Sequence, residues 1–193
     1  PLKDMKNKFL MAQPSEIDHV IKNNENKLVF EEIELNIVPL PGHALNQVGL
    51  EVNNVLFCAD SVFSEEILEK HGIHFNVDID RTKETLRLLK ESRYDFYIPS
   101  HAKPGTKITD LVKNNLSVIN RVERTLLEIL QAEKTTEQAL KEICDDFMIS
   151  LNNPQQYYLA NTTVMAYLSS LHTRDKLHIK VKANRLSWQT VEN

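Results

Sequence analysis

Short apolar runs, bounded by Pro, Gly or Asn, follow one another along the chain from residue 28 to residue 98. Runs of this length predict β-strands, at about 28–30, 35–38, 48–52, 55–58 and 94–98. The pair Asn53-Asn54 predicts a tight hairpin between two of these strands, because Asn tolerates positive φ. The run at 55–58 has no polar residue, which predicts a strand buried on both faces. Pro99 is expected to stop the last strand.

The spacing of apolar residues changes to that of an α-helix in later stretches. Leu86, Leu88 and Leu89 predict a helix over about 80–91, with Asp80 or Thr82 as its N-cap. Beyond Pro104 the pattern predicts a long amphipathic helix at 110–132, helices opening near Thr135 and Pro154, and a terminal hairpin over 177–188. The expected fold class is therefore α/β in two parts: a layered domain at 1–108 and a helical domain at 109–193, which resembles a winged-helix module.

Three metal-capable side chains each stand at the end of a predicted strand: His43, Asp60 and His101. Strand ends meet at the rim of a sheet, so these side chains are candidates for one site. Neutral imidazoles and carboxylates are the ligands that hold zinc and similar divalent ions. Each residue alone also has a plain interpretation, namely a turn histidine, a helix-capping aspartate and a loop histidine.

The run from Ile37 to Phe63 and the run from Tyr97 to His101 resemble the C-terminal half of the metallo-β-lactamase-fold hydrolases. The resemblance implies that His43 binds the first metal, that Asp60 bridges two metals, and that His101 binds the second. It implies two divalent ions, with zinc the first expectation and iron or manganese also suited. The implied reaction is attack by a metal-bridged hydroxide, with Asp60 catalytic, on an ester, thioester or phosphodiester of a small molecule or RNA.

The upstream part of the family pattern is missing. The family's His-x-His-x-Asp-His motif has no match in residues 1–40, and Ala59 stands where the family usually has Gly before its Asp. The chain also begins with Pro1, which we interpret as a start inside a longer gene product. Residues 28–104 then represent half of an αββα sandwich, expected to be inactive alone. The chain is a fragment, a degenerate member without metal, or one partner of a second polypeptide that supplies the missing half.

A non-catalytic nucleic-acid- or protein-binding module is the alternative function. It rests on a cluster of basic residues near the terminal hairpin, namely Arg174, Lys176, Lys180, Lys182 and Arg185. The net charge of −4 over 193 residues argues against a strongly basic nucleic-acid binder. A di-iron electron-transfer module is a weaker alternative, because nothing in the sequence resembles the flavin-binding domain that accompanies such members.

The remaining expectations concern setting and packing. No apolar run approaches the ~20 residues that span a bilayer, so no membrane role is expected. Two lone cysteines suggest a reducing, cytoplasmic setting, with Cys58 a small core residue. His71 and His74 are interpreted as surface or substrate-loop residues, and Tyr157, Tyr158 and Trp188 as packing residues. A homodimer through the helical domain is a further expectation.

Overall fold

The protein is described from a computed structural model that covers residues 16–22 and 24–191. In that part of the chain five strands form one mixed sheet, in the order β1-β2-β3-β4-β5. The first four strands are antiparallel neighbours, while β5 runs parallel to β4. The strands are β1 (Lys27–Phe30), β2 (Ile33–Pro39), β3 (Val48–Val52), β4 (Val55–Phe63) and β5 (Phe96–His101). The five predicted strands and the Asn53-Asn54 hairpin are confirmed, with two differences in where strands end. Strand β4 continues past residue 58 to Phe63, so Asp60 lies within the strand and not at its end. Strand β5 continues through Pro99, because a proline is tolerated where an edge strand needs no further donor.

Helices follow β4 and alternate with the last strands. They are α2 (Glu65–His71), α3 (Ile79–Glu91), α4 (Thr109–Ile129), α5 (Thr136–Asp146) and α6 (Pro154–Thr173). A second sheet has the order β6-β8-β7 and contains β6 (Lys134–Thr135), β7 (Leu177–Lys182) and β8 (Arg185–Thr190). The fold is thus mixed α/β, as predicted. None of the described helices combines the length and the apolar character that crossing a bilayer requires.

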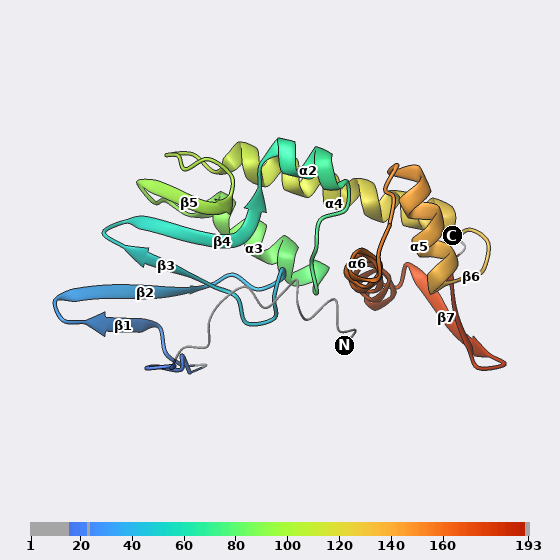
Figure 1. Ribbon diagram of the computed structural model, residues 1–193, viewed down its shortest axis with the longest axis horizontal. Coiled ribbons are helices and arrows are strands. Elements are labelled where there is room, and N and C mark those ends of the chain that lie inside the picture. Colours follow the sequence, from blue (N-terminus) through green and yellow to red (C-terminus); the bar gives the residue numbers. More distant parts are fainter. Residues whose placement is uncertain (1–15, 23, 192–193) are drawn as a thin grey trace.

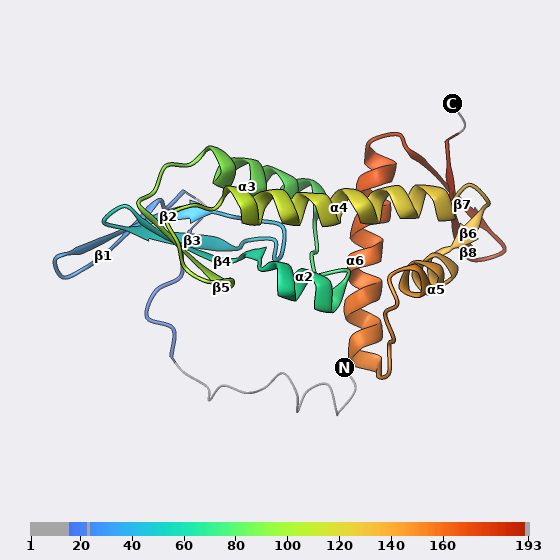
Figure 2. The same cartoon turned by 90° about the horizontal axis from the view of Figure 1, so that it is seen from above.

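Helices α3 and α4 cover one face of the large sheet, and Figure 2 shows them together along one side of it. Beneath them Leu56 and Cys58 of β4 are fully buried. The N-cap of α3 is Asp78, whose carboxylate accepts from the Arg81 N–H. The predicted caps at 80 and 82 are therefore wrong, since the helix begins one residue before Asp80.

The opposite face of the same sheet is apolar and open. Residues paired directly across antiparallel strands share a face, and the register places Phe30 opposite Ile33 and Leu50 opposite Phe57. Phe57 is 43% exposed, so the prediction that its strand is buried on both faces is wrong for the described chain. The side chains that the register assigns to this face are Leu28, Phe30, Ile33, Leu35, Ile37, Leu50, Val52, Val55, Phe57, Phe96 and Ile98, of which only Ile37 is buried.

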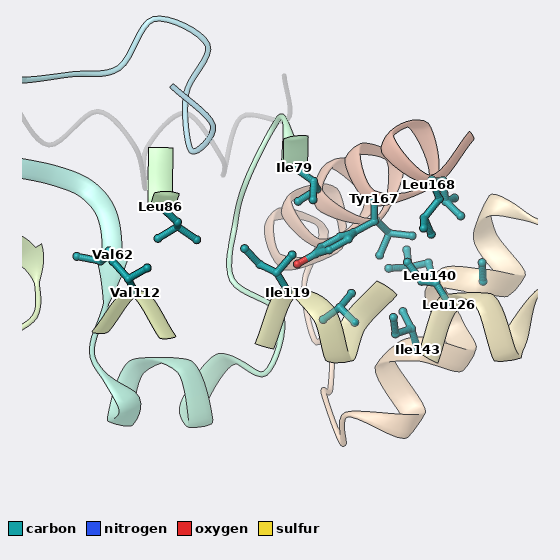
Figure 3. Close-up of a cluster of buried hydrophobic side chains, with 14 of the residues drawn as sticks. Val62, Ile79, Leu86, Val112, Ile119, Leu126, Leu140, Ile143, Tyr167 and Leu168 are labelled. Atoms are coloured by element: carbon teal, nitrogen blue, oxygen red, sulfur yellow. The ribbon is translucent and has the colours of Figure 1, made fainter. Parts of the chain in front are cut away.

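Helix α4 joins the two parts of the molecule (Figures 1 and 2). Its buried residues Val112, Ile119 and Leu126 succeed one another along one face. Figure 3 shows Val112 beside Val62 of the large sheet, Ile119 beside Tyr167 of α6, and Leu126 among side chains of α5 and α6. One continuous hydrophobic core therefore runs from the sheet into the helical part, and α6 crosses α4 within it.

The helices and hairpin of the helical part begin near the predicted residues, although α4 ends at Ile129 and not at 132, and the hairpin extends to Thr190. Thr135 caps α5 in a reciprocal capping box with Gln138, and Asn153 caps α6, in which Pro154 occupies the first turn. Trp188 is buried and its indole N–H donates to Thr136 Oγ1 at 3.0 Å, which confirms its packing role. Tyr157 and Tyr158 are 38% and 52% exposed and so do not pack in the core as predicted, because they lie in the first turns of α6, outside its buried residues.

Candidate metal centre

A bulge in β4 brings Asp60 to the end of the large sheet. The pairing of β4 with β5 shifts register between Phe57 and Ala59 and again between Ala59 and Phe63. Ala59 adopts φ 48°, a left-handed conformation that is rare for a residue with a Cβ atom. Such a bulge re-aims the next side chain, so the strain at Ala59 belongs to the geometry that directs Asp60.

His43 is held by a tight turn between β2 and β3. Gly42 has φ 135°, and a Cβ atom added there would lie 2.3 Å from Thr82 Oγ1. Only glycine fits this position. The Gly42 carbonyl accepts from the N–H groups of Val77 and Asp78, at 2.9 and 3.1 Å. The start of α3 and the loop before it therefore fix the turn that carries His43.

The three predicted residues meet around the carboxylate of Asp60. His43 Nε2 lies 3.5 Å from Asp60 Oδ2, and His101 Nε2 lies 3.4 Å from Asp60 Oδ1. Each carboxylate oxygen thus faces one imidazole, which is the arrangement expected of a carboxylate placed between two cation sites. The ends of β4 and β5 are tied together here, since the Ser64 N–H donates to the His101 carbonyl at 2.9 Å.

A hydrogen bond to the His43 ring determines its tautomer, and hence that the nitrogen facing Asp60 carries a lone pair. Nδ1 of His43 lies 2.9 Å from the Phe75 carbonyl oxygen. A carbonyl can only accept, so Nδ1 carries the proton and donates. In the neutral ring Nε2 then holds a lone pair that points at a carboxylate oxygen, a contact that a cation between them would stabilise.

The donor chemistry fits a divalent metal, but the described residues supply only part of a centre. Each cation position beside Asp60 would have one imidazole nitrogen and one carboxylate oxygen from this chain. Zinc sites have at least three protein ligands. Over residues 16–22 and 24–191 there is no group of three or more His, Cys, Asp or Glu side chains that could hold a metal ion by itself. A complete metal centre would therefore need ligands from outside the described residues.

Phe63 packs among the histidines of the site. Its ring lies 5.4 Å from the ring of His101 and 6.0 Å from that of His43, between centroids. It also lies 5.0 Å from His74, which is buried, so the surface interpretation of His74 is wrong. Burial, with smaller contributions from His43 and His71, lowers the pKa of the His74 imidazole to about 4. The loop after α2 packs against the site through His74, so His74 is buried, whereas His71 at the end of α2 is exposed.

Asn115 of α4 supports the far side of the site. Its side-chain amide donates to the Phe63 carbonyl at 2.8 Å and accepts from the Phe63 N–H at 3.1 Å. It is 1% exposed, so these two bonds replace a strand partner at the end of β4. The helix that links the two parts of the molecule therefore also fixes the backbone beside Asp60.

Cys58 does not take part in this chemistry. Its side chain is fully buried, and burial raises the pKa of the thiol to about 12. It is the small core residue that the sequence predicts.

The predicted nucleic-acid-binding residues divide into two groups. Arg174 closes α6 and forms ion pairs with Glu123 and, at 3.4 Å, with Asp80. Lys180 pairs with Glu133 at 3.1 Å, while Lys182 and Arg185 face one another at the tip of the β7–β8 hairpin. Lys176 lies exposed just before β7. Arg174, whose side chain is 37% exposed, thus pairs with acidic residues of α3 and α4, while Lys176 and the hairpin cations form the rest of the cluster.

Sequence reasoning missed the groups that support the three site residues. The Phe75 carbonyl leaves no trace in side-chain patterns, because any residue offers a backbone oxygen. A packing role for Phe63 beside the site could have been inferred from its place three residues after Asp60. Asn115 lies 52 residues from its partner, and only an Asn on the apolar face of α4 hinted at a buried polar contact.

Residues 17–101 match the family model of the metallo-beta-lactamase superfamily, which confirms the predicted resemblance. A comparison with curated protein sequences gives no significant match. Members of this superfamily are typically metal-dependent hydrolases.

Two solved structures share the fold. One is a metallo-beta-lactamase family protein from Thermus thermophilus, with a TM-score of 0.69 and 14% identity, covering 92% of this chain and 56% of that protein. The other is a beta-lactamase domain protein from Burkholderia ambifaria, with a TM-score of 0.68 and 14% identity, covering 93% of this chain and 54% of that protein. The chain therefore spans just over half the length of these relatives.

Proposed function

Because residues 17–101 match the family model of the metallo-beta-lactamase superfamily, we propose that this chain contributes His43, Asp60 and His101 to the binuclear centre of a metal-dependent hydrolase. The observation that supports it is the placement of one Asp60 oxygen against Nε2 of each histidine, at 3.5 and 3.4 Å. His43 would hold one ion, His101 the other, and Asp60 both. The substrate class is an ester, thioester or phosphodiester.

Each residue has a distinct task in this proposal. His43 presents Nε2 because Nδ1–H is held by the Phe75 carbonyl. Asp60 offers one oxygen on each side, and its aim depends on the bulge at Ala59. When bound, two divalent ions, zinc first among them, would supply Lewis acidity and activate water as the nucleophile. Phe63 keeps the imidazole of His101 on the Asp60 side by stacking with it.

The open apolar face of the large sheet supports a further part of the proposal. Phe30, Ile33 and Phe57 are each more than 40% exposed on that face, among neighbours that are all apolar. Contiguous apolar patches of this kind mark interfaces. We propose that a further layer of polypeptide, in cis or in trans, covers this face and brings the remaining ligands to the Asp60 end of the sheet.

The helical part has a secondary role in this proposal. Its element order, three helices with a short strand after the first and a terminal hairpin, supports a winged-helix-like module. It would line a substrate groove or form a dimer contact.

The alternative, nucleic-acid binding by the basic cluster, depends on Lys176, Lys180, Lys182 and Arg185, since Arg174 is engaged in ion pairs. A gel shift with short RNA and DNA at rising salt tests it, since phosphate binding weakens steeply with salt. Absence of binding at low salt removes the alternative.

The direct test uses the product of the complete gene. We expect about two equivalents of divalent metal per chain and hydrolysis of at least one of four probes: p-nitrophenyl acetate, a small thioester, bis(p-nitrophenyl) phosphate and a short RNA. Asp60→Asn should remove the metal and lower the rate by about a thousandfold or more.

The matched control is Asp95→Asn. Asp95 is an exposed carboxylate just before β5, at the opposite end of the sheet from Asp60. Its substitution should change neither metal content nor rate. Retention of metal and activity by Asp60→Asn, or equal losses in both variants, would contradict the proposed centre.

A further inference from the structure

One peptide group connects His43 to the helical part of the molecule. Its carbonyl belongs to Phe75 and accepts from His43 Nδ1–H at 2.9 Å. Its N–H belongs to Asn76 and donates to Thr163 Oγ1 of α6 at 3.4 Å. The imidazole and the threonine hydroxyl are therefore on opposite sides of the same planar unit, although Asn76 and Thr163 are 87 residues apart.

The hydroxyl continues the chain of hydrogen bonds into α6. Thr163 Oγ1 donates its own proton to the Leu159 carbonyl at 3.2 Å. Thr163 and Asn76 are only 1% and 2% exposed, so water does not substitute for either of them. Hydrogen bonds aligned in this way polarise one another, and each strengthens the acceptor at the next step.

The side chain of Asn76 lies against α3. Its Oδ1 is 3.1 Å from Thr82 Oγ1, whose single proton is also within reach of the nearer Asp78 carbonyl at 2.7 Å, and the same Thr82 lies against Gly42. Figure 2 shows the segment between α2 and α3 passing beside α6. Rotation of the Phe75–Asn76 peptide would break its hydrogen bonds to Thr163 of α6 and to His43, so these two bonds set the direction of its carbonyl.

We infer that Thr163 is a positioning residue for His43: through the Phe75–Asn76 peptide it holds the ring in the Nδ1–H tautomer, with Nε2 directed at Asp60. The helical part then does more than pack against the sheet, because a hydroxyl on α6 sets the donor geometry of the candidate centre. The consequence for metal affinity rests on the proposed function, whereas the consequence for the tautomer does not.

The test uses the full chain labelled with ¹⁵N-histidine, without metal, at a pH where the rings are neutral. Thr163→Val keeps the shape and removes the hydroxyl. We expect the Nε2–H tautomer of His43 and the exchange rate of the Asn76 amide each to rise about fivefold, as loss of one ordinary hydrogen bond predicts. His43→Asn identifies the His43 signals.

The matched control is Thr162→Val. Thr162 is the neighbouring residue, is exposed, and donates to the Tyr158 carbonyl in the same way, at 2.8 Å. It should leave both signals unchanged, and Thr163→Ser, which keeps the hydroxyl, should behave like the natural chain. Equal spectra for the two valine variants, or a loss in Thr163→Ser as large as in Thr163→Val, would overturn the inference.

Two further measurements keep the inference separate from the proposed function. In the natural chain the His43 Nδ1–H should be protected from solvent exchange. Absence of this protection would overturn the inference even if Thr163→Val fails to fold. In the complete gene product Thr163→Val should bind zinc about tenfold more weakly than Thr162→Val. If no variant binds zinc but the tautomer shifts as expected, the proposed function fails while the role of Thr163 holds.

Discussion

The rings of Phe63 and His101 are stacked, with centroids 5.4 Å apart and planes 15° from parallel. They come from neighbouring strand ends, since Phe63 pairs with His101 in the register of β4 and β5. Phe63 is 6% exposed, whereas the side chain of His101 is 47% exposed. The buried ring is therefore the support, and the exposed imidazole is the group whose orientation depends on it.

Replacement of Phe63 by Leu should loosen His101. The stacked contact is lost, and the chain should be destabilised by about 1–2 kcal/mol, as for a buried aromatic residue replaced by a smaller apolar one. Urea unfolding measures the loss of stability, and the line width of the His101 ring signals measures the loosening of His101. Phe57→Leu is the control, because Phe57 lies on the open face of the same strand. Equal changes in the two variants would show that Phe63 has no special relation to the site.

Ala59→Gly should stabilise the chain. Ala59 holds φ 48°, where a Cβ atom costs roughly 1–2 kcal/mol, and glycine removes this strain at the expense of greater freedom in the unfolded chain. We expect a net gain of up to about 1 kcal/mol in urea unfolding. Ala44→Gly is the control: Ala44 is exposed near the same site and has no positive φ. A gain in Ala44→Gly, or a loss in Ala59→Gly, would contradict the assignment of strain to residue 59.

Local chemistry explains which parts of the structure the sequence predicts. Apolar runs and the Asn53-Asn54 pair are local signals, so the strands and the hairpin followed from them. The convergence of His43, Asp60 and His101 was predicted from places at strand ends, although Asp60 lies at a bulge inside β4. The buried groups that hold these three residues could not be predicted, because they depend on contacts between residues far apart in the sequence. For example, 32 residues separate His43 from Phe75.

Two errors have the same physical origin. Asp78 and Asp80 both satisfy the pattern of an N-cap, and only the contact between the loop and Gly42 decides which one ends the extended segment. From its place near Gly72, His74 is predicted to be a loop residue, yet tertiary packing buries it against Phe63. In both cases the deciding interaction is tertiary and leaves no periodic trace in the sequence.

Acid should destabilise the fold through His74. Burial lowers its pKa to about 4 in the folded chain from about 6.5 in the unfolded chain. Between these values the unfolded chain binds more protons, so the free energy of unfolding falls as the pH is lowered from about 6.5 to 4 and is unaffected by His74 above that range. The full effect is on the order of 3 kcal/mol.

The measurement is urea unfolding at pH 7, 6 and 5 for the natural chain and for His74→Phe. The variant should lose less stability than the natural chain as the pH falls, because it has no imidazole to protonate there. His178→Gln, at an exposed histidine on β7, should keep the slope of the natural chain. Parallel slopes for the natural chain and His74→Phe would contradict a buried neutral His74.

Glu123 should be essential to the packing of three helices. Its carboxylate accepts from Lys83 of α3 at 2.7 Å and pairs with Arg174 at the end of α6. The side chains of Glu123 and Lys83 are 11% and 12% exposed, so Glu123→Ala leaves a largely buried ammonium without its counter-ion. We expect a loss of about 3 kcal/mol in thermal or urea unfolding.

The control on the same helix is Glu128→Ala, at an exposed position, where a change within about 0.5 kcal/mol is expected. Lys83→Met in the Glu123→Ala background should recover part of the loss, because it removes the uncompensated charge. Arg174→Gln should also lower stability, whereas Lys182→Gln, at the hairpin tip, should not. If Arg174→Gln instead weakened RNA binding and left stability intact, the ion pair with Glu123 would be incidental and the basic cluster would act as one surface.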